Sequence, residues 1–160
     1  MNVKITEHEG ITFLWINGKM WMWDLPEEVK IQKQLADQCY GDVLVAGYGL
    51  GILQMYLSES RHIQSVITVE KEPEVIKVCI DHYKNIYGGV TIRDFFDIEP
   101  KTVVNKWDCI VGDFWIEIHP DGLPCYKKFR ERAEELIKPH GKILGWGMDY
   151  YEYLINCEGV

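Results

Sequence analysis

Short apolar runs alternate with segments of helical periodicity along most of the chain, and this alternation restricts the possible folds more than any other feature. Residues 43–46 (Val-Leu-Val-Ala) form a continuous apolar run, which is typical of a parallel strand buried on both faces. Comparable runs follow at residues 66–69, 90–92, 107–111 and 142–146. Strands that alternate with helices predict a Rossmann-like, doubly wound α/β fold with a mainly parallel sheet of about five strands.

The expected helices lie between and after these runs. One covers residues 52–58, another begins at Pro73, and a longer amphipathic helix covers residues 126–137, beyond which Pro139 ends it. Only 14 residues follow Trp146, too few for a further helix together with a pair of strands. The sequence therefore predicts no more than about five core strands.

The first forty residues predict a β-hairpin followed by a helix. Two β-prone runs, Ile11–Ile16 and Lys19–Trp23, flank an Asn-Gly pair, which is typical of the type I′ turn between two hairpin strands. A third β-prone run, residues 3–7, precedes them. Pro26 suits the first turn of a helix that runs to about Gln38. The apolar residues expected on its inner side are Val29, Ile31, Leu35 and Ala36.

Composition and charge exclude several function classes. Of the 160 residues, 47% are hydrophobic and 26% are charged, as in an ordinary globular domain. The net charge of −8 argues against nucleic-acid binding, which needs a basic surface, and suits a cationic partner. No stretch resembles a membrane span or a signal peptide, so a cytoplasmic location is expected. The five cysteines have no CxxC spacing, which argues against a zinc site or a disulfide framework.

The length of the chain fits one domain. No repeat, low-complexity segment or linker divides the sequence. Residues 1–160 are therefore expected to form a single domain, with the hairpin and leading helix in residues 1–40 and the core in residues 41–147.

A glycine-rich turn joins the first core strand to the helix after it. Gly47, Gly49 and Gly51 follow the apolar run directly, and the helix begins at Ile52. Glycines let the backbone turn sharply and approach a ligand closely at the positive end of a helix. The turn therefore predicts a ligand site, and a tight turn that binds nothing is the alternative.

An acid at the end of the second core strand supports this ligand site. Glu70 lies 19 residues after Gly51, and in a doubly wound fold the end of this strand lies beside the glycine turn. A carboxylate there can accept hydrogen bonds from both ribose hydroxyls of an adenosine, whereas a solvated strand-end acid is the alternative. Lys71 adjoins Glu70 and belongs to the predicted site. Glu72 and Glu74 are expected as charges at the start of the next helix.

The spacing of the glycines separates two ligand types. A dinucleotide site has the pattern GxGxxG, and a dehydrogenase would need a second domain for its substrate. This chain has GxGxG over residues 47–51, followed by Ile52. Together with the leading hairpin and helix and the later acid, this pattern resembles the class I S-adenosylmethionine-dependent methyltransferases, and in layout their spermidine-synthase-like members. The resemblance covers about residues 11–147. It implies S-adenosylmethionine, or its decarboxylated form, as cofactor, and no metal.

The resemblance also implies roles for acids after the third and fourth strands. Asp94 matches the family's residue near the adenine amino group, with Asp97 as competitor, and Phe95 would pack on the adenine ring. Asp113 matches the acid that faces the reaction site, which makes it the candidate catalytic base or acceptor-binding acid. The implied cofactor-binding residues are Gly47, Tyr48, Gly49, Gly51, Glu70, Lys71, Asp94, Phe95 and Asp113.

Three departures from the spermidine synthases leave the reaction open, and the last two strands of the usual seven-stranded methyltransferase sheet also lack a counterpart. The glycine-rich loop of the spermidine synthases carries an acid for the ligand's amino group, whereas residues 47–51 (Gly-Tyr-Gly-Leu-Gly) carry none. Residues 29–32 (Val-Lys-Ile-Gln) replace their Tyr-His-Glu motif, and residues 113–117 (Asp-Phe-Trp-Ile-Glu) replace Asp-Ser-x-Asp-Pro. Methyl transfer to a small-molecule acceptor is the first expectation. Aminopropyl transfer, or another cleavage of the sulfonium that yields methylthioadenosine, is the second, and a non-catalytic binder of S-adenosylmethionine is the third.

The loop after the fourth strand carries further polar residues. Asp113, Glu117 and His119 lie on it, at the sheet edge where doubly wound folds bind ligands. His119 precedes a proline in a polar stretch and is expected to be an ordinary exposed histidine. A metal held by Asp113 and Asp149 is disfavoured, because no third ligand is evident.

Large apolar side chains occupy both faces of the predicted hairpin. One face should cover the core. The other should either cap the acceptor site or, as we prefer, form the contact between two subunits of a homodimer. The residues concerned are Phe13, Trp15, Met20, Trp21, Met22 and Trp23.

Overall fold

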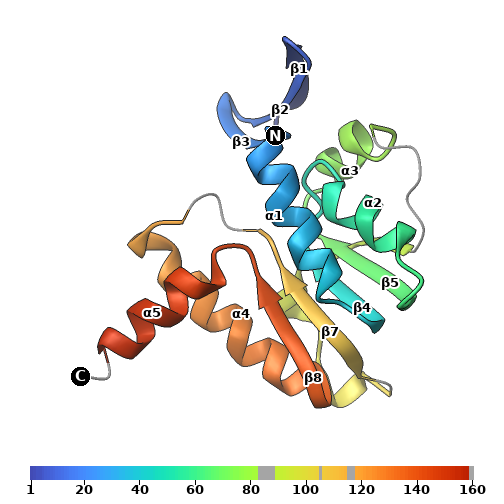
Figure 1. The fold of residues 1–160 in the computed structure, drawn as a ribbon, viewed down its shortest axis with the longest axis vertical. Coiled ribbons are helices and arrows are strands. Elements are labelled where there is room, and N and C mark those ends of the chain that lie inside the picture. The colour runs from blue at the N-terminus through green and yellow to red at the C-terminus, as the bar shows by residue number, and fades with distance from the viewer. Residues whose placement is uncertain (83–88, 105, 115–117, 159–160) are drawn as a thin grey trace.

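A five-stranded, entirely parallel sheet forms the centre of the computed structural model, which describes residues 1–82, 89–104, 106–114 and 118–158 (Figure 1). The strands are β4 (Gly41–Ala46), β5 (Ile63–Glu70), β6 (Gly89–Ile92), β7 (Trp107–Gly112) and β8 (Ile137–Gly145). Their order is β6-β5-β4-β7-β8, so the chain builds outwards from β4 first to one side and then to the other. The direction reverses between β4 and β7, which is where doubly wound sheets bind ligands. The predicted Rossmann-like fold with five core strands is confirmed.

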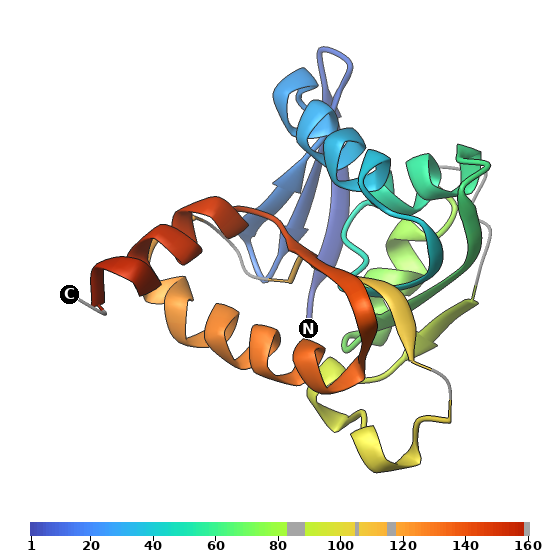
Figure 2. The same cartoon turned by 60° about the horizontal axis from the view of Figure 1, so that its bottom comes forward.

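Helices cover both faces of this sheet (Figures 1 and 2). The helices that do so are α1 (Pro26–Asp37), α2 (Ile52–Glu59), α3 (Pro73–Cys79) and α4 (Leu123–Leu136), whereas α5 (Met148–Glu158) packs against α4 beside the sheet. Val43 and Val45 point into the core that includes residues of α1 and α2, whereas Leu44 and Ala46 point into the core beside α4. Successive side chains of β4 thus enter two separate cores, which explains the uninterrupted apolar run in the sequence.

A separate antiparallel sheet precedes the core and lies at the top of the view in Figure 1. It consists of β1 (Val3–His8), β2 (Ile11–Ile16) and β3 (Lys19–Trp23). The predicted Asn-Gly turn is present, because Asn17 and Gly18 have φ values of 50° and 77°. The hairpin is extended by β1, which pairs with β2 along its whole length. Leu14 is fully buried and packs this small sheet onto α3 and the turn after β4.

The buried side of α1 differs from the prediction. The buried residues are Glu28, Gln32, Leu35 and Ala36, whereas Ile31 is 38% exposed. The pattern of apolar residues does not predict which side of α1 faces inward, because two of the inward positions carry polar side chains that form hydrogen bonds at the sheet edge. Pro26 occupies the first helical turn as expected. The carboxylate of Asp24 accepts a hydrogen bond from the backbone N–H of Thr12, and no described side chain caps the N-terminus of the helix.

The C-terminal part also differs from the prediction. β8 begins at Ile137, inside the predicted helix, and its pairing with β7 shifts register before Lys142. The residues after Trp146 form α5, which the sequence did not indicate. Tyr151 anchors this helix, because it is fully buried and its ring stacks on that of Tyr126 at 5.0 Å. Within the described part of the chain, no helix is both long and apolar enough to cross a membrane.

Candidate functional site

The turn after β4, residues 47–51, is here called the glycine loop, and it lies between the carboxyl ends of β5 and β7, the two strands that flank β4. The N–H of Gly47 donates to the carbonyl of Val69 at the end of β5, at 2.9 Å. On the other side, the N–H of Asp113 donates to the carbonyl of Ala46, also at 2.9 Å. Gly47 has a φ of 99°, and a Cβ there would collide with the carbonyl oxygen of Asp113. A glycine is therefore required for the loop to pass beside the residue that follows β7.

The small N-terminal sheet covers the outer side of the glycine loop. The Sδ of Met22 accepts a hydrogen bond from the N–H of Leu50 at 3.5 Å and would lie 2.7 Å from a Cβ at Gly49. Tyr48 is buried beside the loop, and Gly51 immediately precedes α2. The loop is therefore held from β3 on one side and leads into the positive end of α2 on the other.

Glu70 ties the end of β5 to the glycine loop. Its Oε1 accepts a hydrogen bond from the N–H of Tyr48 at 3.2 Å, and its Oε2 accepts one from the N–H of Glu72 at 2.9 Å. Burial raises the pKa of the Glu70 carboxyl above its ordinary value, and these two hydrogen bonds oppose the rise. The carboxylate thus lies beside the glycine loop, where the sequence predicted it, while Lys71 is exposed.

The residues after β6 take different positions. The Oδ1 of Asp94 accepts a hydrogen bond from the N–H of Phe96 and caps a short 3₁₀ turn, Phe95–Asp97. Phe95 is only 5% exposed, and its ring centroid lies 5.4 Å from that of Phe129 in the core. Its side chain therefore belongs to the core, which does not support the predicted packing of this ring on an adenine. Asp97 is exposed.

Asp113 lies at one end of a buried polar chain that the sequence did not reveal. The amide nitrogen Nε2 of Gln32 donates to Oδ2 of Asp113 at 2.8 Å and to Oε1 of Glu28 at 2.9 Å. The indole Nε1 of Trp146 donates to Oε2 of Glu28 at 3.2 Å. We call these four residues the polar network. Gln32 is fully buried, and its Oε1 has no hydrogen-bond partner among the described residues.

Burial, modified by the polar network, sets the pKa of the Asp113 carboxyl. Burial raises the pKa of its carboxyl to about 7; the hydrogen bond from Gln32 lowers it in part, and the Glu28 carboxylate adds to the rise. A carboxyl group with this pKa is divided between its two forms near neutral pH. It can therefore accept or release a proton under ordinary conditions.

The stability of the protein should fall as pH rises, because of this group. The folded-state pKa of Asp113 lies above its value in the unfolded chain, so its contribution is fully present below pH 4 and is lost as pH rises through about 7. We expect the free energy of unfolding to decrease by roughly 1–3 kcal/mol between pH 5 and pH 8 from this residue. Urea unfolding at the two pH values measures it. The decrease should shrink in Asp113→Asn, and an unchanged decrease would contradict the assignment.

One signal in the sequence could have indicated part of the network. Glu28 and Gln32 are four residues apart and therefore share a side of α1, between the apolar positions. Trp146 comes from the far end of the chain and carried no such signal.

The loop after β7 contributes less to the candidate site than the polar network does, because His119 is exposed and its Nδ1 accepts a hydrogen bond from the N–H of Asp121. Glu117 lies outside the described residues.

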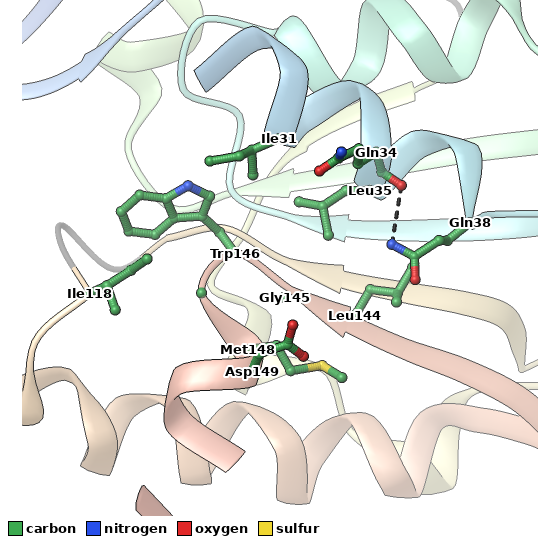
Figure 3. A pocket seen from close by; sticks show the side chains of 11 residues that line it. Ile31, Gln34, Leu35, Gln38, Ile118, Leu144, Gly145, Trp146, Met148 and Asp149 are labelled. Carbon is green, nitrogen blue, oxygen red and sulfur yellow. Dashed lines mark hydrogen bonds between the residues drawn. The ribbon is translucent and has the colours of Figure 1, made fainter. Parts of the chain in front are cut away.

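A pocket of about 310 Å³ lies next to the network, between α1 and the connection from β8 to α5 (Figure 3). Trp146 forms part of its wall. The backbone N–H of Trp146 donates to the carbonyl of Gly112, the residue before Asp113, at 3.1 Å. Pocket and network therefore meet at the carboxyl edge of β7 and β8. Over the described ranges, no three His, Cys, Asp or Glu side chains converge as a metal site would need.

The sequence matches no protein-family model and no curated protein. The structure is similar to the spermidine synthase of Thermotoga maritima, with a TM-score of 0.64, 14% identity and coverage of 85% of this chain and 50% of that one. It is also similar to the N-methyltransferase NodS from Bradyrhizobium japonicum, with a TM-score of 0.55, 15% identity and coverage of 83% and 81%.

A third similar structure is an S-adenosylmethionine-dependent methyltransferase from Clostridium acetobutylicum, with a TM-score of 0.53, 14% identity and coverage of 72% of this chain and 49% of that one. The chain thus spans about half the length of this protein and of the spermidine synthase. At these identities the likeness establishes a shared fold, which agrees with the family that the sequence resembles.

Proposed function

We propose that this protein is an S-adenosylmethionine-dependent transferase, and specifically a methyltransferase that acts on a small-molecule acceptor. The observation that carries the proposal is the position of Glu70. Its carboxylate adjoins the glycine loop at the point where the strand order reverses, and Asp113 follows the strand on the other side of that point. A carboxylate that can accept hydrogen bonds from the ribose and an acid that can act near the sulfonium of the cofactor thus lie on either side of one loop.

The residues present fit the cofactor. Glu70 has two carboxylate oxygens, whose bonds to the N–H groups of Tyr48 and Glu72 leave lone pairs for ribose hydroxyls. Gly51 directly precedes the first turn of α2, whose N–H groups form the positive end of that helix. When bound, S-adenosylmethionine supplies an activated methyl group on a sulfonium.

The chain's own contribution is positioning and proton transfer. An acceptor must approach the methyl carbon in line, and the site must hold it in that geometry while excluding water. Asp113 is the proposed base, because a carboxylate with a pKa of about 7 can take the proton of an acceptor at neutral pH. Gln32 holds one carboxylate oxygen at 2.8 Å and leaves the other for the acceptor.

Analysis of the products tests the proposal. The protein is incubated with S-adenosylmethionine and a panel of small amines, alcohols and acids, and the nucleoside products are measured by mass spectrometry. S-adenosylhomocysteine is the expected product. Methylthioadenosine would instead assign an aminopropyltransferase or another sulfonium-cleaving enzyme, and absence of either product despite binding would assign a non-catalytic binder.

We also propose that the protein is a homodimer formed through the N-terminal sheet. Phe13, Trp15 and Trp23 share one face, where the ring of Phe13 lies 6.4 Å from each of the other two. Trp21 and Met22 instead pack toward the core with Leu14. The face that contains Phe13 is therefore an apolar surface outside the core, of the kind that partners cover.

Trp23→Glu should then convert the dimer to monomer, because a charge on the apolar face would have to be desolvated in the contact. Light scattering over a concentration series measures the mass. Lys19→Glu, at the exposed tip of the hairpin, is the control that should leave the dimer intact. A wild-type protein that is monomeric at high concentration would refute this proposal.

A further inference from the structure

The pocket beside the polar network has the size and lining of a small-molecule site. Its volume of about 310 Å³ lies within the range of ligand pockets in proteins. Its apolar wall residues are Ile31, Leu35, Ile118, Leu144 and Met148. Two of them, Ile31 and Ile118, are 38% and 45% exposed, so part of the apolar lining is open to solvent. A bound apolar group would remove this surface from water.

The wall opposite α1 depends on a glycine. Gly147 has a φ of 70°, and a Cβ at this position would lie 2.6 Å from the Cγ1 of Ile118. Any other residue would therefore push Ile118 away from its position in the wall. The turn between β8 and α5 is thus shaped so that an isoleucine from a distant loop completes the pocket.

The charged lining favours a cation. Among the described residues that line the pocket, Asp149 supplies a carboxylate, Gln34 and Gln38 supply amides, and no side chain is basic. Figure 3 shows the Asp149 carboxylate beside Met148, at the start of α5. An anionic ligand would find no charged partner here. An ammonium group would find the Asp149 carboxylate. The chain's net charge of −8 is negative as well and would attract a cation.

Trp146 connects the pocket with the polar network. Its indole ring lines the pocket, and its Nε1 donates to Glu28, which shares Gln32 with Asp113. The face of an indole ring attracts an ammonium group. A ligand that packs on this ring therefore lies one side chain away from the Glu28 carboxylate, and Gln32 links that carboxylate to the proposed base, Asp113.

We propose that this pocket binds the acceptor of the transferase, and that the acceptor is a small organic ammonium ion with an apolar body. The apolar body packs between α1 and the β8–α5 turn, and the ammonium group pairs with Asp149 and the Trp146 ring. The role as acceptor site rests on the proposed function. The choice of an ammonium ion rests on the lining alone.

The test uses three probes of one shape and different charge: 2-phenylethylammonium, 2-phenylethanol and 3-phenylpropionate. Binding to the whole protein without S-adenosylmethionine is followed by the NMR signal of the Trp146 indole N–H, which Trp146→Phe identifies among the six tryptophans. The ammonium ion should bind about three- to tenfold more tightly than the alcohol, and the carboxylate most weakly. In Asp149→Lys the order of affinities should reverse, so that 3-phenylpropionate binds most tightly.

Asp121→Asn is the matched control, since Asp121 is an exposed acid on the neighbouring loop and does not line the pocket. This variant should bind the three probes in the same order of affinity as the wild type. Equal binding of ammonium and alcohol would overturn the ligand class, and no saturable shift of the Trp146 signal with any probe at millimolar concentration would overturn the pocket. Because no nucleoside is present, a protein that binds these probes but not S-adenosylmethionine would refute the proposed function and leave the ammonium site standing.

Discussion

Asp113→Asn should lower kcat by about 10²- to 10⁴-fold at pH 8, the range by which a positioned base accelerates a reaction. Asparagine keeps the shape of the side chain and can still accept the hydrogen bond from Gln32. The variant therefore removes the proton-accepting function while leaving the packing in place. Initial rates with saturating acceptor measure the effect.

The pH dependence of the wild type separates a base from a merely structural acid. A base works in its deprotonated form, so kcat should rise as pH increases through about 7 and then level off. Asp113→Asn should lose this rise. Asp121→Asn, which removes a charge from the exposed loop after β7, should retain both the rate and the profile. A variant at position 113 with wild-type kcat would exclude Asp113 as the base.

Glu70→Ala should weaken the binding of S-adenosylmethionine by roughly ten- to a few hundred-fold. Hydrogen bonds from two ribose hydroxyls to a carboxylate contribute about 1.5–3 kcal/mol each without being additive, and about 1.4 kcal/mol corresponds to a factor of ten. The fold should survive, because Glu70 lies at a strand end and is only half-buried. Calorimetric titration of the variant measures the loss.

Two further variants separate the ribose contact from the structure of the loop. Glu70→Gln keeps an oxygen for the N–H of Tyr48 but removes the charge, so its affinity should lie between those of alanine and wild type. Glu72→Ala should change affinity by less than about threefold, since an acid at a helix start contributes under ~1 kcal/mol. If Glu72→Ala is the damaging change, Glu70 is not the ribose acceptor.

The sequence predicted the core well because the central strands are buried on both faces. Residues 43–46 must be apolar throughout when alternate side chains enter two cores, and such a run has few other interpretations. The Asn-Gly turn and the glycine loop were predictable for a related reason. Positive φ values at Gly18 and Gly47 are backbone requirements that few residues meet.

The polar network as a whole was not predictable, because it joins residues from three parts of the chain. Glu28 and Gln32 are polar and were not among the inner positions predicted for this helix, and they are buried only because their partners lie at the sheet edge. The same limitation applies to Phe95, whose motif indicated a ligand contact although its ring fills the core. The helix α5 was missed because its packing depends on tertiary contacts with α4, such as the stacking of the fully buried Tyr151 on Tyr126.

The most direct test of the account is a calorimetric titration of the wild-type protein with S-adenosylmethionine, S-adenosylhomocysteine and NAD. The spacing of Gly47, Gly49 and Gly51 and the position of Glu70 beside Tyr48 predict micromolar binding of the first two compounds and no comparable affinity for NAD. Tighter binding of NAD, or no heat with either sulfur compound, would contradict the assignment of this site.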